Sequence, residues 1–361
     1  MTTLTGGATA RRTAFHPLTV RAVERLTDDA AAVTFDLPDA LRDEFAFAAG
    51  QSLTLRRVLG GVEHRRTYSI CAPVGGPPRI GVREVPGGLF SSWLVHDVRP
   101  GDRVEVQAPS GAFRADPAAG GRHLCVAAGS GITPVLSIAA SLLRGSDARV
   151  TLLYGNRTAG SVMFADELAD LKDACPDRLE LVHVLSREPR DVDLFSGRLD
   201  GARLRELLRR VVPVADVDHA WLCGPLGMID EARAALAEAG VPADRVHREL
   251  FWVDEPPPQL RRPDRVVEGE TSQVTVVLDG RATTSAVPRD ERLLDAAQRV
   301  RADLPFACRG GVCGTCRARV VEGEVDMVRN YALEPQEVAA GFVLTCQSYP
   351  AGDHVVVDYD A

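Results

Sequence analysis

The alternation of apolar and polar residues divides the chain into segments with different expected architectures. Over residues 15–116, short alternating runs such as AAVTFDL, QSLTLRRV and DRVEV are separated by glycine and proline. Regularly spaced short strands of this kind are typical of an antiparallel barrel or sandwich. We expect one short helix in this segment, around LFSSWLVHDV.

The second segment, residues 117–252, changes to a repeating order of strand and helix. Apolar runs such as HLCVAA, RVTLLYG and DHAWLCG alternate with helical stretches such as PVLSIAASLL and ARLRELLRRV. This order predicts βαβ units and therefore an α/β domain with a doubly wound parallel sheet.

A linker and a third domain are expected after the parallel sheet. Residues 253–271 are rich in proline and charge and show no apolar periodicity, which indicates an exposed linker. Residues 272–361 open with a hairpin that turns at Asp279-Gly280, continue through a helix around ERLLDAAQRVRAD and a glycine-rich cysteine loop, and end on a strand. We therefore expect a multidomain chain of β-barrel, α/β and α+β domains, preceded by a disordered stretch over residues 1–14.

Composition and charge narrow the class of protein. The chain of 361 residues is 45% hydrophobic and 25% charged, as in ordinary soluble globular proteins. Its net charge of -8 and pI of about 5.6 argue against nucleic acid as a partner. No apolar run is long enough for a membrane span, and none follows Arg11-Arg12 as an export signal requires, so we expect a cytoplasmic protein without a membrane partner.

The cysteines carry the strongest chemical signal. In the cytoplasm, clustered cysteines more often bind metal than form disulfides. The third segment contains the pattern Cys308-x4-Cys313-x2-Cys316, and Cys346 follows after 29 further residues. Four thiolates can hold a two-iron cluster, whereas structural zinc usually takes paired Cys-x2-Cys ligands. The loop glycines can bring backbone N–H groups near the cluster with unusual φ angles: Gly310, Gly311 and Gly314. The other cysteines Cys71, Cys125 and Cys175 are expected to be small buried hydrophobic residues.

A resemblance to a known family supports the cluster. The segments CRGGVCGTCR and VLTCQ closely resemble a plant-type [2Fe-2S] ferredoxin. The resemblance implies a β-grasp fold for the third domain and a one-electron carrier held by the four cysteines.

The first segment carries a candidate flavin site. Arg66 could pair with a phosphate, Tyr68 could stack on a flavin ring, and Gly87-Gly88 could hold a pyrophosphate. Arg-x-Tyr-Ser followed by Gly-Gly-x-x-Ser resembles the FAD-binding domain of the ferredoxin–NADP reductase superfamily. That likeness implies FAD as a cofactor and the following set of binding residues: Arg66, Tyr68, Ser69, Val82, Arg83, Gly87, Gly88, Leu89 and Ser91.

The second segment carries a candidate nicotinamide site. After the strand HLCVAA, a glycine turn opens a helix, where free N–H groups can bind a pyrophosphate. The third glycine of the dinucleotide fingerprint is missing. The motifs GSGITP and CGPLGM are, however, typical of the same reductase superfamily. The implied residues are Gly129, Gly131, Thr133, Pro134, Cys223, Gly224, Pro225 and Met228.

The end of RVTLLYGNR bears on the choice of coenzyme. A carboxylate at this position would accept a hydrogen bond from the 2′-hydroxyl of NADH, but this chain has Asn156-Arg157, with Ser161 shortly after. These residues favour NADPH and leave NADH possible. Near the linker, the sequence HRELF resembles the end of the family's reductase module. This likeness places Glu249 and Phe251 at the flavin and nicotinamide. The nicotinamide should meet the flavin where the barrel joins the sheet, with Ser69, Cys223 and Glu249 around it as catalytic residues.

Together the sites form a complete relay. A nicotinamide donates a two-electron hydride and iron centres accept single electrons, so FAD is expected between NADPH and the cluster. Across nearly its whole length the chain resembles the reductase components of phenylacetyl-CoA epoxidase complexes, which implies a di-iron oxygenase as electron acceptor.

Two alternatives stay open: a reductase of another aromatic or steroid oxygenase, and a flavin–iron-sulfur sensor or zinc-stabilised binding module. Candidate docking residues for the acceptor are Arg309, Arg317 and Arg329.

Overall fold

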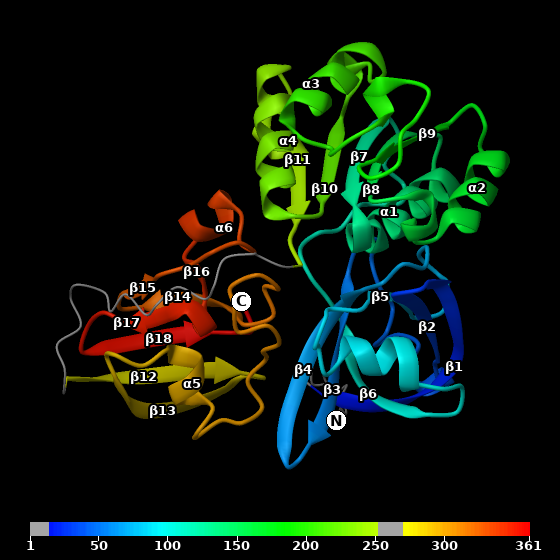
Figure 1. Cartoon of the computed structure of the whole chain (residues 1–361). Helices are drawn as coiled ribbons and strands as arrows, with labels where there is room; N and C mark the ends of the chain where they lie inside the picture. Colours follow the sequence, from blue (N-terminus) through cyan, green and yellow to red (C-terminus); the bar gives the residue numbers. More distant parts are fainter. Residues whose placement is uncertain (1–13, 252–269) are drawn as a thin grey trace, which may run out of the picture.

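Three domains make up the part of the chain that the computed structural model describes, residues 14–251 and 270–361 (Figure 1). The α/β domain, in green, lies on the N-terminal barrel, in blue and cyan. The C-terminal domain, in yellow to red, lies beside both. The disordered stretch expected at the N-terminus and the linker expected over residues 253–271 lie almost wholly outside the described residues.

The first domain is the expected antiparallel barrel. Its sheet has six strands in the order β4-β3-β6-β1-β2-β5, and a bridge between Ile70 and Ile80 joins the two ends. Alternate residues such as Val33 and Phe35 point inward and are fully buried. The short helix expected around LFSSWLVHDV is a π-helical turn, η2. The elements are β1 (Phe15–Thr27), β2 (Ala30–Asp36), η1 (Asp39–Leu41), β3 (Ser52–Leu59), β4 (Val62–Ser69), β5 (Arg79–Arg83), η2 (Trp93–Asp97) and β6 (Arg103–Ser110).

The second domain is the predicted doubly wound sheet. All five strands are parallel, in the order β11-β10-β7-β8-β9. Helices α1 and α2 cover one face and α3 and α4 the other, and each pair buries its apolar side in a separate core. The elements are β7 (Arg122–Ala128), η3 (Gly129–Gly131), α1 (Ile132–Gly145), β8 (Arg149–Asn156), η4 (Ala159–Ser161), α2 (Ala165–Ala174), β9 (Leu179–Leu185), η5 (Asp193–Phe195), α3 (Gly201–Arg210), η6 (Val214–Asp216), β10 (His219–Cys223), α4 (Leu226–Glu238), η7 (Ala243–Arg245) and β11 (Val246–Glu249).

The third domain has a mixed sheet in the order β13-β12-β18-β14-β16, with β12 and β18 parallel. The expected hairpin turns at Asp279 and Gly280, whose φ angles of 52° and 68° are those of a two-residue hairpin turn. The expected helix near residue 295 is only five residues long, because Arg301 donates to the carbonyls of Leu278 and Arg281 and so turns the chain back onto the hairpin. The elements are β12 (Thr271–Leu278), β13 (Arg281–Pro288), α5 (Leu293–Ala297), β14 (Arg317–Glu322), β15 (Val325–Met327), α6 (Pro335–Ala339), β16 (Phe342–Leu344), η8 (Thr345–Gln347), β17 (Ser348–Pro350) and β18 (His354–Asp358).

The barrel and the parallel sheet are packed tightly against each other. A Cβ added at Gly81 of β5 would lie 2.4 Å from Cγ2 of Thr133 in α1. The hydroxyl of Ser137 in α1 donates to the carbonyl of Ala72 at 2.7 Å. Because these contacts connect the barrel to α1, they fix the position of the barrel relative to the carboxyl ends of the parallel strands.

Two chain turns meet at the centre of the parallel sheet. Gly131 begins the turn into α1, and a Cβ there would lie 2.1 Å from the carbonyl oxygen of Cys223, at the end of β10. Because that oxygen belongs to backbone, the sheet must move to admit any side chain at this position.

We therefore expect Gly131→Ala to destabilise the protein by about 1–3 kcal/mol or more, as overpacked sites do. Thermal unfolding and coenzyme binding measure the effect, and both should be impaired. Gly352→Ala is the matched control, because its Cβ would meet nothing within 4 Å. Equal unfolding midpoints for the two variants would show that the turns are not in close contact.

Candidate active site

The three predicted catalytic residues come together where the barrel meets the parallel sheet. Cys223 and Glu249 are the last residues of β10 and β11 and are paired across the two strands. Ser69, the last residue of β4, donates its hydroxyl to Oε2 of Glu249 at 3.0 Å. The carboxyl ends of parallel strands are where α/β sheets bind ligands, so this position suits a coenzyme.

The surroundings keep these groups uncharged near neutral pH. Burial raises the pKa of Glu249 to about 8, and the hydrogen bond from Ser69 only partly opposes that shift. Burial, and then the neighbouring charge of Glu249, raise the pKa of the Cys223 thiol well above its ordinary value. A carboxyl group with a pKa near 8 can hold or release a proton at physiological pH.

The two glycine motifs open helices at the centre of the sheet. Gly129 and Gly131 bound the turn η3 after β7, and Gly224 and Pro225 precede α4 after β10. The strand order reverses between β7 and β10, which is where doubly wound sheets bind nucleotides. The remaining predicted residues support the helices: Thr133 donates to the carbonyl of Ser130 at 3.0 Å, Pro134 lies in the first turn of α1, and Met228 is buried in the first turn of α4.

The predicted coenzyme-selecting residues lie at the end of β8 and just after it. Asn156 is buried, and within the described residues neither of its amide atoms has a hydrogen-bond partner of ordinary geometry. Arg157 is exposed just beyond the carboxyl end of β8. Ser161 already uses its hydroxyl locally, since it donates to the carbonyl of Thr158 at 2.8 Å. An unpaired buried amide beside an exposed cation fits a polar anionic ligand such as a pyridine nucleotide.

The flavin candidates on β4 and the glycine turn offer different groups to a ligand. The Arg66 guanidinium is exposed, and the Tyr68 ring packs against Phe90 with the ring centroids 6.1 Å apart. Gly87 has a φ of 73° and nothing within 4 Å of a Cβ position, so the turn is open. A cation, an aromatic face and an open glycine turn on one barrel face fit a flavin dinucleotide.

Other predicted flavin residues have structural contacts that the sequence did not indicate. Arg83 donates to the carbonyl of Ser161 at 2.6 Å and so links the barrel to the α/β domain. The Ser91 hydroxyl accepts from the N–H of Val85 at 3.0 Å and closes the glycine turn, where Gly88 leaves no room for a Cβ. The last three candidates differ in exposure: Val82 is buried in the barrel core, Leu89 is 63% exposed and Phe251 is 39% exposed.

The four predicted cluster ligands are free thiols that fall into two pairs. Cys308 is exposed and accepts hydrogen bonds from the N–H groups of Gly310 at 3.3 Å and Cys313 at 3.4 Å. Hydrogen bonding, with the Cys313 thiol contributing most, lowers the pKa of Cys308 to about 5. Cys316 and Cys346 are buried and interact with each other in the same way. In each pair the same interaction lowers the pKa of one thiol, Cys308 or Cys346, which favours the thiolate that binds iron, and raises the pKa of its partner.

The pairing of the four thiols fits a two-iron cluster. Two thiols for each iron match the observed pairs. Gly311 and Gly314 have positive φ as expected, but Gly310 does not, and Arg309 takes a φ of 54° instead.

The three arginines considered for docking already have partners. Arg309 pairs with Asp295 at 3.0 Å, and Arg317 pairs with Glu337 at 3.0 Å. The Arg329 guanidinium lies 5.4 Å from the centroid of the Tyr331 ring. Each therefore stabilises the region around the cluster loop, whatever it contributes to a partner.

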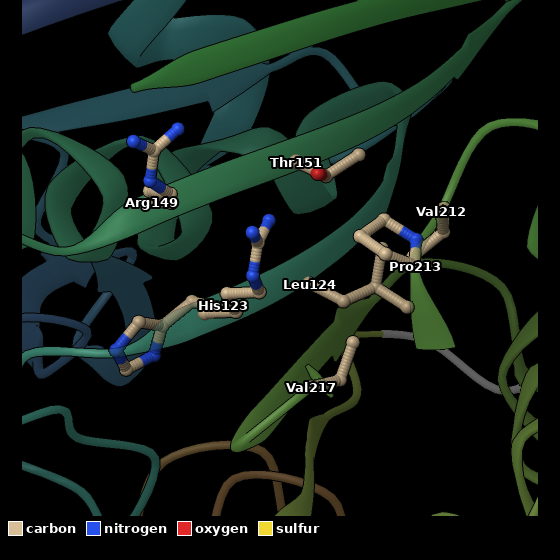
Figure 2. A pocket seen from close by; sticks show the side chains of 8 residues that line it. His123, Leu124, Arg149, Thr151, Val212, Pro213 and Val217 are labelled. Atoms are coloured by element: carbon tan, nitrogen blue, oxygen red, sulfur yellow. The ribbon is translucent and has the colours of Figure 1, made fainter. Parts of the chain in front are cut away.

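A small cavity lies at the opposite end of the parallel sheet from Cys223 and Glu249. Arg122, His123, Arg149 and Thr151 line it from the amino-terminal parts of β7 and β8 (Figure 2). Its free space is that of about one water molecule. It is therefore not the coenzyme site.

One contact near the cluster involves residues that the sequence motifs did not indicate. The guanidinium of Arg65 on β4 stacks on the ring of Phe306, just before Cys308, at 4.1 Å from the centroid. Arg65 and Arg66 are neighbours of the same residue type. Only the packing of β4 against the segment around Phe306 makes the two arginines differ. Nothing in a single sequence tells the buried arginine from its exposed neighbour.

The comparisons with known proteins match all three domains. Residues 17–115 match the family of oxidoreductase FAD-binding domains, residues 125–234 the oxidoreductase NAD-binding domains, and residues 276–351 the 2Fe-2S iron-sulfur cluster binding domains. The matched ranges fall one in each domain of the fold. They also cover all four cluster cysteines and both glycine motifs of the α/β domain.

Relatives of similar length share this order of domains. The chain is 44% identical to one of the subunits of 1,2-phenylacetyl-CoA epoxidase from Escherichia coli (strain K12), over 97% of this chain and 99% of that one. It is 34% identical to the ferredoxin reductase component of 3-ketosteroid-9-alpha-monooxygenase from Rhodococcus rhodochrous, over 95% and 96% of the two chains. The solved structure of phthalate dioxygenase reductase, 24% identical, has the same fold with a TM-score of 0.59 over 95% of this chain and 98% of that one.

Within the described residues, no helix has the length and apolar character needed to span a membrane. The domains, the paired thiols and the relatives all indicate an oxidoreductase with FAD, NAD and [2Fe-2S] domains. The chain therefore belongs to the ferredoxin–NADP reductase superfamily, among the reductase components of oxygenases that carry a C-terminal [2Fe-2S] domain.

Proposed function

We propose that this protein passes electrons from NADPH to a di-iron oxygenase that epoxidises the ring of phenylacetyl-CoA. The supporting observation is 44% identity to a component of 1,2-phenylacetyl-CoA epoxidase over nearly the full length of both chains. A reductase for a steroid oxygenase is the second candidate, supported by 34% identity over a similar length. Four cysteines expected to hold a cluster as thiolates suit the reducing cytoplasm as the site of action.

Each domain contributes residues to one step of this relay. Bound FAD would take up the hydride and release single electrons, which a bound [2Fe-2S] cluster carries onward. In our proposal Arg66, Tyr68 and the turn at Gly87 hold the flavin, while the turns at Gly131 and Gly224 hold the coenzyme pyrophosphate. Binding in this way orients both groups and excludes water between them.

Ser69, Cys223 and Glu249 surround the position of the nicotinamide in this proposal. Because the Glu249 carboxyl has a pKa of about 8, it is mainly protonated at neutral pH and would place no negative charge beside a bound flavin. The hydroxyl of Ser69 lies 3.0 Å from Oε2 of Glu249 and donates a hydrogen bond to it. The chain thus supplies two hydrogen-bonding groups with no fixed charge.

Coupling to a purified oxygenase tests the proposal. NADPH consumption with the oxygenase component of a phenylacetyl-CoA epoxidase should be matched by epoxide formation. Cys308→Ser should retain NADPH-dependent flavin reduction, since Cys308 lies in another domain, but should lose epoxidation. Cys175→Ser is the matched control because Cys175 lies away from the cluster loop, and it should behave as the wild type. Coupling to a steroid oxygenase alone would support the second candidate.

Coenzyme choice is expected to depend on Arg157. Its exposed guanidinium, beside the unpaired amide of Asn156, can pair with a 2′-phosphate. Arg157→Ala should raise the KM for NADPH about ten-fold or more, the usual cost of a lost charged hydrogen bond, with little change for NADH. Steady-state kinetics with both coenzymes check this, and Arg144→Ala, an exposed arginine at the end of α1, is the control. Equal effects on both coenzymes would contradict the assignment.

Glu249 should make stability depend on pH. An unfolded glutamate titrates near pH 4.3, whereas the folded carboxyl titrates near 8, so the folded state binds this proton more tightly. The folded state therefore loses stability, relative to a neutral side chain, as the pH rises between those values. Glu249→Gln should raise the unfolding midpoint of the FAD-loaded protein more at about pH 9 than at about pH 5.

Thermal unfolding at the two pH values measures the difference. The exposed Glu180→Gln on β9 is the control and should give the same small change at both. A Glu249→Gln effect that does not vary with pH would contradict the raised pKa.

A further inference from the structure

We propose that Arg65 is a positioning residue that docks the cluster loop onto the flavin strand β4 by stacking on Phe306. The inference rests on the proposed function, because it concerns the step from the flavin to the cluster. It assigns a role to two residues that lie outside the motifs for FAD, coenzyme and cluster.

The contact is built from both domains. The Arg65 side chain is only 6% exposed, although it carries a charge. Its guanidinium lies 4.1 Å from the ring centroid of Phe306 in the C-terminal domain and 4.9 Å from that of Phe15 in the barrel. A planar guanidinium between two aromatic rings is the arrangement that arginine, and not lysine, can make.

Hydrogen bonds fix the direction of the guanidinium. Nε of Arg65 donates to Oε1 of Glu63 at 2.7 Å, on its own strand. Nη1 donates to the carbonyl oxygen of Leu304 at 3.5 Å, across the domain boundary. A charged group is rarely buried without such partners, so the carbonyl of Leu304 and the ring of Phe306 are part of the environment that makes the burial of Arg65 possible.

Phe306 connects this contact to the cluster ligands. It stands two residues before Cys308. Its ring also lies 4.5 Å from the guanidinium of Arg309, so the two arginines hold it from separate domains. On the other side, Arg65 is three residues before Tyr68, the aromatic candidate for the flavin. The path from the flavin strand to the first thiol is therefore short and continuous.

The α/β domain holds the same loop from another side. Val312, between two of the ligands, and Tyr331 pack against the core that α3 and α4 form. Arg248 on β11 lies 3.8 Å from a carboxylate oxygen of Glu334. These contacts are apolar or partly exposed, so the buried arginine at Phe306 is the directional contact that places the cluster relative to the barrel.

Stopped-flow absorbance on the full chain loaded with FAD and cluster tests the role of Arg65. In Arg65→Ala, flavin reduction by NADPH should keep its wild-type rate, because the coenzyme site is untouched. Oxidation of the flavin by the cluster, with cytochrome c as the final one-electron acceptor, should slow on the order of 10-fold to 100-fold, since misplaced redox groups react poorly. Arg65→Lys should not restore the rate, because an ammonium cannot stack as a plane.

A second readout does not depend on turnover. Hydrogen–deuterium exchange should speed up in residues 301–310 of Arg65→Ala, because the loop loses its partner. Arg57→Ala is the matched control: its guanidinium lies 4.2 Å from the ring centroid of Trp93, within the barrel, and does not reach the loop. It should change neither exchange in the loop nor electron transfer.

Phe306→Leu keeps the inference testable if Arg65→Ala fails to fold. It changes the other domain, preserves apolar volume and should slow the same step. Wild-type transfer rates in either folded variant would overturn the inference, and so would an equal loss of flavin reduction in both. Wild-type protein without flavin and iron–sulfur absorption bands would instead contradict the proposed function, so the two failures can be told apart.

Discussion

The arrangement of the barrel and the α/β domain depends on the meeting of two strand ends, which a single hydrogen bond joins. The hydroxyl of Ser69 and the carboxyl of Glu249 are 180 positions apart in the chain and 3.0 Å apart in space. One belongs to the barrel, which carries the flavin motif, and the other to the parallel sheet, which carries the coenzyme motif. A hydride moves only over a short distance, so these two strand ends must meet for the two motifs to act together.

The packing around this bond explains how the meeting point is held. At Gly81 and Gly131 the backbone of one segment approaches the next so closely that no Cβ fits. Ser137 and Arg83 add hydrogen bonds between the barrel and the α/β domain. Interiors packed in this way resist displacement, because every shift costs contacts on several sides. The same burial raises the pKa of Glu249, so packing and electrostatics at this site have one cause.

The third domain meets a different requirement. Single electrons can travel further than a hydride, and the acceptor is another protein, so the cluster must lie near the flavin and also remain reachable from outside. The exposed thiol of Cys308 and the loop contacts of Phe306 and Val312 satisfy both conditions. The loop is held by side chains from two domains, while Cys308, one of the predicted ligands, is exposed.

The elements, the order of the domains and the kinds of chemistry could all be predicted from the sequence alone. Apolar periodicity placed the barrel strands and the βαβ units, the Asp279-Gly280 pair specified its hairpin, and the cysteine spacing specified an iron–sulfur cluster. These features depend on residues close together in the chain, where backbone preferences and ligand spacing act directly. The expected helix near residue 295 was too long because Arg301 binds carbonyls of a preceding hairpin, which is not a local effect.

Which of several similar residues meet depends on how the domains pack against one another. Arg65 and Arg66 are neighbours of the same type, yet one is buried against Phe306 and the other is exposed. Arg83 contacts the α/β domain, and Glu249 acquires a pKa near 8. Each outcome depends on atoms from segments far apart in the chain, because burial and hydrogen bonding are set by how folded domains pack and not by the order of residues within one of them.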